Sequence, residues 1–209
     1  IEKAFERKDF SLVKKLSQEG ERLSKEQNLA GMVNTWRVWM LRASEAERNI
    51  PEIKKHTLSL FLDTGDLDYY KRYKRCFSDS EWKKEVERVI NLSGEPKGYC
   101  QDTTAQIFIQ EQRWNNLLAY AQKNLSSYIL EFHGKYLAPR FPQEMATMYE
   151  RVITGELAPE TGRSNYKRVC QFLRRMKKVD AHERVKALIE ELSFKYKNRP
   201  AFLEEMRRV

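Results

Sequence analysis

The fold is decided by residues 163–209, which read RSNYKRVCQFLRRMKKVDAHERVKALIEELSFKYKNRPAFLEEMRRV. Apolar side chains recur there at helical spacing, first at Tyr166, Val169, Leu173 and Met176 and then at Val185, Leu188, Ile189 and Leu192. Asp180, with Glu183 three residues later, has the form of a capping box, so one helix is expected to end and another to begin there. Pro200 suits the first turn of a third, short helix. The segment predicts an antiparallel pair of amphipathic helices closed by a third one.

The same pairing of helical segments continues through the rest of the chain. Apolar faces at helical spacing are separated by short breaks at residues 49–51, 64–66, 78–80 and 139–142. A helical pair about every 35 to 45 residues is typical of α-solenoids, in the range of tetratricopeptide repeats. No consensus signature recurs, so the prediction depends on period and pairing. We expect an all-α chain, a single α-solenoid of antiparallel helical hairpins over 1–209, with a sub-boundary between two halves near residues 93–99.

The charge of the chain is high and unevenly placed. Charged residues make up 33% of the 209 residues, and the mean hydropathy is −0.75. The net charge is +9, and residues 160–209 hold 14 Lys and Arg against 7 Asp and Glu, a surplus of 7. Such a region can attract nucleic acid or an acidic protein. It can equally be the solvated face of a Lys- and Glu-rich helix. No apolar run approaches the length of a membrane span, so no membrane partner is expected.

The cysteines indicate the cellular location of the chain, and its first residues indicate whether it is part of a longer protein. Three cysteines, Cys76, Cys100 and Cys170, lie far apart in sequence and cannot form a complete disulfide framework. Reduced thiols and a cytoplasmic location are expected. No targeting peptide is recognisable. The first residue is Ile1, and residues 1–5 resemble the interior of a helix, so we expect a piece of a longer protein.

No catalytic or metal-binding pattern is recognisable in the sequence. His56, His133 and His182 are isolated, and no two Cys or His lie within four residues, whereas zinc signatures come from such close pairs. Neither G-x-S-x-G nor H-E-x-x-H occurs, and the glycines are too dispersed to cradle a phosphate. Cys170 lies on an apolar helix face, which favours a place in the core. We expect no metal, cofactor or catalytic residue.

The chain is rich in aromatic residues. They could line a groove that holds a peptide or stack on single-stranded bases, or they could wedge one helix against another. The best candidates for contact with a partner follow a tight turn and mix polar tips with basic heads: Tyr70, Arg72, Tyr73 and Lys74.

A basic stripe is expected on the helix within 163–178. Arg174 and Lys178 are four residues apart and share one face, with Arg168 and Arg175 near it. A stripe of this kind can follow phosphates without reading bases. It can also pair with Glu residues of a neighbouring helix. The candidate nucleic-acid-binding residues are therefore Arg168, Arg174, Arg175 and Lys178.

Several local strings are more specific than helical periodicity. They are LFLDTGDLDYYKRYK at 60–74, IFIQEQRW at 107–114, and YKRVC at 166–170 together with RPAF at 199–202. In these strings the chain resembles the carboxy-terminal helical region of bacterial SWIM zinc-finger proteins. The resemblance implies a tetratricopeptide-like scaffold that follows a small zinc module. The C-x-C and C-x-H pairs that hold zinc in that family are absent here, so the zinc module would lie upstream of Ile1.

The sequence therefore predicts a non-enzymatic helical repeat scaffold. Its expected partner is a protein or peptide, or the upstream domain of its own chain. The alternative is an accessory domain that binds nucleic acid through the basic C-terminal face. An enzyme with an unfamiliar site is a third option, which would need an acid–base pair converging in a deep pocket.

Overall fold

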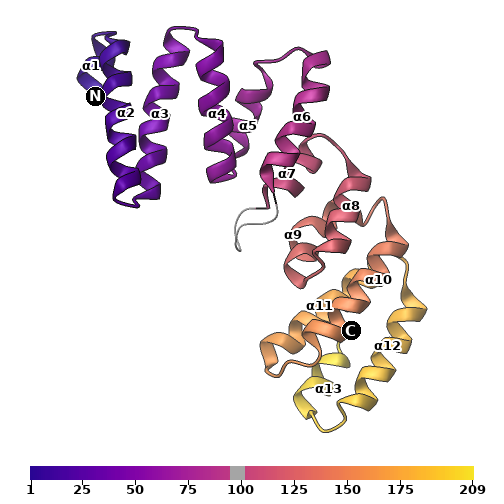
Figure 1. Ribbon diagram of the computed structural model, residues 1–209. Coiled ribbons are helices and arrows are strands. Elements are labelled where there is room, and N and C mark those ends of the chain that lie inside the picture. The colour runs from indigo at the N-terminus through magenta and orange to yellow at the C-terminus, as the bar shows by residue number, and fades with distance from the viewer. Residues whose placement is uncertain (95–101) are drawn as a thin grey trace. The chain divides into compact units, whose positions relative to one another are not determined.

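The computed structural model describes residues 1–94 and 102–209 (Figure 1). All regular secondary structure within these ranges is helical, which confirms the all-α prediction. The chain divides into two compact units, Ile1–Ile107 and Phe108–Val209. The expected sub-boundary near 93–99 falls largely on residues outside the described ranges. Each unit is described by itself below.

The first unit is a succession of helices, each packed against its neighbours in sequence (Figure 1). Its elements are α1 (Glu2–Glu6), α2 (Phe10–Glu26), α3 (Ala30–Ala46), α4 (Ile50–Thr64), α5 (Leu67–Lys74), α6 (Asp79–Ser93) and the greater part of α7 (Thr103–Gln110). As the turn signals predict, Gly65 ends α4 in the left-handed region, and Ser78 begins α6 with a capping box to Glu81. The Ser78 amide donates to Glu81 Oε2 at 2.8 Å.

The second unit is organised around its longest helix, α11. Its elements are α8 (Trp114–Lys123), α9 (Ser127–Leu137), α10 (Pro142–Val152), a π-helical turn η1 (Ile153–Leu157), α11 (Arg163–Lys178), α12 (His182–Lys195) and α13 (Pro200–Met206). Helix α11 contacts α10, η1, α12 and α13, and its apolar face is fully buried. The three helices predicted within 163–209 are confirmed. The π-helical turn η1 follows α10 without a break, and Gly162 precedes α11.

Five connections between consecutive helices are built alike. In each, one residue other than glycine adopts the left-handed conformation, with φ between 54° and 61°: Lys8, Asn28, Arg48, Gln112 and Asp180. The amide of the next residue donates to the carbonyl five positions earlier, at 2.8 to 3.3 Å, which satisfies a carbonyl left open at the helix end. The fifth residue after the turn is apolar each time: Val13, Val33, Ile53, Leu117 and Val185. The first three turns follow at intervals of 20 residues.

The turn at Asp180 corrects one prediction. A helix does end and another begin there, but Asp180 does not cap the second helix. It ends α11 with φ 61°, and the residue before α12 is Ala181, whose side chain makes no capping hydrogen bond. The capping-box pattern failed because the left-handed residue of the turn comes one position before the helix cap.

Helices α2 and α3 approach closely at Gly20. A Cβ atom at this position would lie 2.4 Å from Trp36 Cε2, so the indole occupies the space that a side chain would need. The indole Nε1 donates to Ser24 Oγ, one turn further along α2, at 3.0 Å. Gly20 therefore lets the Trp36 ring lie against the backbone of α2.

We predict that Gly20→Ala lowers stability although alanine is the better helix former. Helix propensity favours alanine by about 1 kcal/mol, whereas the overlap with Trp36 is expected to cost about 1–3 kcal/mol. The matched control is Gly31→Ala in α3, where a Cβ would meet no atom within 4 Å. Urea unfolding curves measure both variants. If Gly20→Ala raises the free energy of unfolding as much as the control does, the close contact between the Trp36 ring and Gly20 is contradicted.

A second prediction concerns the left-handed turns. Arg48→Gly should raise the free energy of unfolding by up to about 1 kcal/mol, because only glycine adopts this conformation without steric cost. Arg48→Ala removes the same side chain but keeps the Cβ atom, so it should bring no gain. Thermal melts of the two variants separate the backbone effect from the loss of the arginine. Equal melting temperatures would argue against the turn geometry.

Candidate functional site

Tyr70 and Tyr73 lie in the core of the first unit and not on its surface. Their exposed fractions are 1% and 2%. The Tyr70 ring packs edge-on against Trp82, with 5.6 Å between centroids, and Tyr73 packs against Phe77 at 5.0 Å. This burial corrects the expectation that the two rings contact a partner. Aromatic rings after the turn wedge α5 against α4 and α6.

The two cations of the same candidate set are half-buried and engaged within the unit. Arg72 pairs with Glu45 of α3, and its guanidinium lies 3.7 Å from the Asp68 carboxylate. The Lys74 ammonium lies 5.4 Å from the centroid of the Trp82 ring. Both side chains therefore hold α5 in place.

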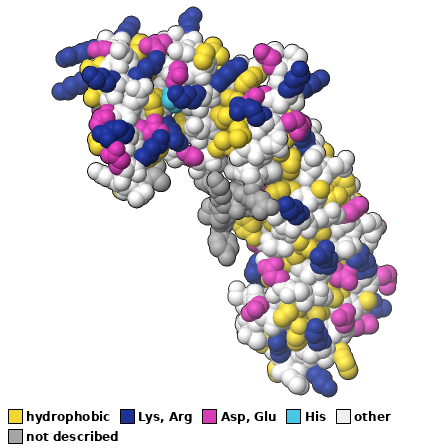
Figure 2. Space-filling view, in the orientation of Figure 1, with side chains coloured by type: hydrophobic (Ala, Val, Ile, Leu, Met, Phe, Trp, Pro, Cys, Tyr) yellow, Lys and Arg dark blue, Asp and Glu magenta, His cyan; other side chains and the backbone are white. Residues whose placement is uncertain are grey.

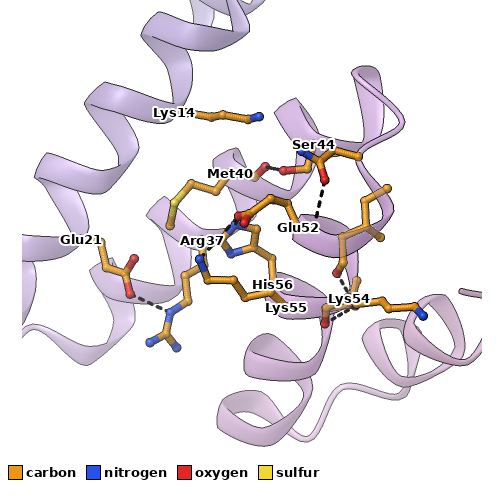
Figure 3. A network of polar contacts seen from close by, with 12 residues as sticks. Lys14, Glu21, Arg37, Met40, Ser44, Glu52, Lys54, Lys55 and His56 are labelled. Carbon is orange, nitrogen blue, oxygen red and sulfur yellow. Dashed lines mark hydrogen bonds and ion pairs between the residues drawn. The ribbon is translucent and has the colours of Figure 1, made fainter.

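A chain of polar contacts crosses α2, α3 and α4 (Figure 3). Arg37, on α3, donates from Nε to Glu21 Oε1 of α2 at 2.9 Å and pairs through its other end with Asp63 of α4. Lys14 of α2 pairs with Glu47 at the end of α3. Helical periodicity did not identify these residues, because the partner of each lies on the neighbouring helix and far away in sequence. The ion pairs fix the spacing of three consecutive helices.

His56 is the buried ionisable group of this region (Figure 3). Its Nε2 lies 3.0 Å from Glu52 Oε2, one turn earlier on α4. Burial lowers the pKa of His56, the Glu52 carboxylate opposes this shift, and the nearby Lys55 ammonium reinforces it. The lowered pKa favours the neutral imidazole in the folded unit.

In the second unit, two of the four basic candidates are already bound. Arg168 donates to Ser127 Oγ at 2.7 Å and to Glu131 Oε1 at 3.2 Å, both on α9. Arg174 donates to the carbonyl of Arg208 at 3.0 Å. Of the two roles considered for the basic stripe, phosphate binding or pairing with a glutamate of a neighbouring helix, Arg168 thus has the second.

The other two basic candidates, Arg175 and Lys178, meet at an open cleft of about 460 Å³. Helices α9, α10 and α11 and the turn after α9 form its walls. Lys135 is a third cation, and Glu131 is the carboxylate of the lining. Apolar and small residues complete it: Leu130, Gly134, Ala138, Pro139, Tyr149 and Val179. Helical spacing in the sequence identified Arg175 and Lys178 of α11 as candidates. Lys135 belongs to α9, and no feature of the sequence linked it to them.

Charge is mixed on the face of the molecule that Figure 2 shows. Figure 2 shows acidic and basic side chains interspersed on the visible face, with hydrophobic side chains between them. Several C-terminal arginines have carboxylate partners, including Arg163 with Glu204 and Arg184 with Glu150. The surplus of positive charge is therefore largely dispersed.

The described residues hold no group of three or more His, Cys, Asp or Glu that could bind a metal. Cys76 donates from Sγ to the carbonyl of Arg72 at 3.4 Å, and Cys170 is buried on α11 as its apolar face predicts. Burial raises the pKa of both thiols, which disfavours the reactive thiolate. Cys100 lies outside the described residues. Within the described ranges no helix is long and apolar enough to cross a bilayer.

Comparison with protein-family models, with curated proteins and with solved structures gives no match for this chain. The resemblance to SWIM zinc-finger proteins therefore stays a prediction from local strings.

The pKa of His56 gives a prediction of pH dependence. Because burial lowers this pKa, the unfolded chain binds a proton more readily than the folded one as pH falls through about 6.5. The stability contributed by neutral His56 is present above that pH and is lost below it. We expect the free energy of unfolding to fall between about pH 7.5 and pH 5.5.

The matched pair His56→Gln and His182→Gln tests the origin of this slope. His182 is exposed, with 63% of its side chain accessible, so its replacement should leave the slope unchanged. His56→Gln should flatten it. Urea unfolding at a series of pH values gives both slopes, and equal slopes for the two variants would contradict the assignment.

Proposed function

We propose that this chain is an α-solenoid of tetratricopeptide-like hairpins that acts without catalysis, as a scaffold binding another protein. The observation that carries the proposal is the turn repeated at Lys8, Asn28, Arg48, Gln112 and Asp180. Repeated turns of one geometry generate stacked helical pairs, in which each pair contacts mainly its neighbours. Stacks of this kind bury a continuous core and present an extended surface, whose usual role is to hold a peptide or a domain.

An exposed apolar stripe on α2 gives further support. Leu12, Leu16 and Leu23 are 41%, 42% and 42% exposed. At 100° per residue they lie within about 40° of one another around the helix. Aligned exposed leucines on one helix face are unusual on a free surface and are typical of contact sites.

The resemblance to the SWIM zinc-finger family adds an expectation to this proposal. An upstream zinc module of the same protein would then be one partner of the helices. The chain and such a module can be expressed as two separate polypeptides. Size-exclusion chromatography would then show whether they elute as one complex.

Nucleic-acid binding remains the second candidate, favoured by the unpaired cations at the cleft. It is less well supported, because Arg168 and Arg174 are engaged by Glu131 and by a backbone carbonyl. Fluorescence anisotropy with labelled single- and double-stranded DNA tests it. Binding that fades steeply with salt, and is lost when Arg174, Arg175 and Lys178 are replaced by Glu, would place nucleic acid first.

The scaffold proposal is tested by capture from native lysate. The immobilised chain is compared with a control carrying Val86→Asp and Leu173→Asp, which disrupts both cores while leaving most of the surface composition intact. Retention of specific proteins by the folded chain only is the expected result. Equal retention by the control would mean charge-driven adhesion, and no retention at any salt concentration would refute the proposal.

A further inference from the structure

We propose that the cleft formed by α9, α10 and α11 binds an acidic peptide segment in which an apolar side chain lies between carboxylates. This inference rests on the proposed function, because it names the class of partner that the scaffold would hold. Its evidence is independent of the repeated turns. It comes from the charges, the lining and the internal support of this single cleft.

The cleft holds three cations without a carboxylate partner. Within the described ranges, neither Lys135, Arg175 nor Lys178 forms an ion pair with a carboxylate. The remaining charged lining residue, Glu131, is paired with Arg168 at 3.2 Å, so its charge is already balanced. Three uncompensated positive charges around one concavity attract an anionic ligand and hasten its approach.

The floor of the cleft is apolar. Leu130, Ala138, Pro139 and Val179 contribute to the lining together with the buried Tyr149. At about 460 Å³ the cleft lies in the range of ligand-binding pockets. An apolar side chain is needed to use this floor, and carboxylates on either side of it would reach the cations. Those two requirements define an acidic peptide with an apolar residue inside it.

Arg175 is held in position by the core beneath it. Its guanidinium lies 5.0 Å from the centroid of the Phe172 ring, and Phe172 packs edge-on against Tyr149 at 5.6 Å. Next to them, Gly134 leaves room for the Tyr149 hydroxyl, which would lie 2.9 Å from a Cβ at that position. A cation held in this way loses little conformational freedom on binding.

The same features disfavour a nucleic acid in this cleft. Single-stranded nucleic acids are held by exposed aromatic rings on which bases stack, whereas Phe172 and Tyr149 are buried with 0% and 3% exposure. Arg168 and Arg174, which could have extended a phosphate track along α11, have other partners.

The test measures binding of a fluorescein-labelled Glu-Glu-Leu-Glu-Glu peptide to the whole chain by fluorescence anisotropy. We expect binding at low salt that weakens as sodium chloride rises from about 20 to about 300 mM. The double variant Lys135→Glu with Lys178→Glu should weaken binding at least tenfold. Arg175 is left intact because it packs on Phe172, so the core is not disturbed.

Two controls separate the cleft from the overall charge. Lys195→Glu with Lys197→Glu makes the same change in net charge at the end of α12, away from the cleft lining, and should leave the affinity within about twofold. A Lys-Lys-Leu-Lys-Lys peptide should bind the charge-reversed cleft and not the original one. Thermal melts of all variants verify that each is folded.

Several outcomes would overturn the inference. The first is the absence of peptide binding at low salt, and the second is equal weakening of that binding by the two double variants. The third is displacement of the peptide by an oligothymidylate of equal charge whose own binding depends on Lys135 and Lys178. If the peptide fails to bind while native lysate still yields a fold-dependent partner, only the inference is lost. If neither binds, the scaffold proposal fails as well.

Discussion

Within each unit, the succession of helices depends on turns in which one residue is held in the left-handed conformation by backbone hydrogen bonds. At Asn28 the amide donates to Lys25 O at 3.1 Å, and the next amide donates to Ser24 O at 2.8 Å. These two bonds close the end of α2 and reverse the chain within very few residues. Val13 and Val33, the fifth residues beyond the first two turns, are buried, so these reversals bring α2 and α3 in with a buried face toward the previous helix.

Side chains then set the distances between the reversed helices. In the first unit, the absence of a side chain at Gly20 admits the Trp36 ring, and Arg37 joins Glu21 and Asp63 across three helices. Exposed or half-exposed ion pairs contribute little stability each. Their effect here is geometric, since Arg37 can satisfy both carboxylates only when α2, α3 and α4 keep their spacing.

The second unit combines a tightly packed helix with an uncompensated charge. The apolar face of α11 is buried against α10, η1, α12 and α13, while Arg175 and Lys178 project from it into the cleft. The basic residues of the C-terminal region therefore fall into two groups. Arginines such as Arg163 and Arg168 join helices, whereas Arg175 and Lys178 form no ion pair with a carboxylate among the described residues.

Periodicity and turn residues are local signals, so they were enough to predict the all-α class, the three helices within 163–209 and the core position of Cys170. The sequence also placed Arg174 and Lys178 on one helix face, with Arg168 and Arg175 near it. The packing of the helices was needed to show that Tyr70 and Tyr73 belong to the core, that Arg168 pairs with Glu131, and that Lys135 lines the cleft. Each of these facts depends on which helix packs against which, and a helical period of 3.6 residues says which side of a helix is apolar without naming the helix that covers it.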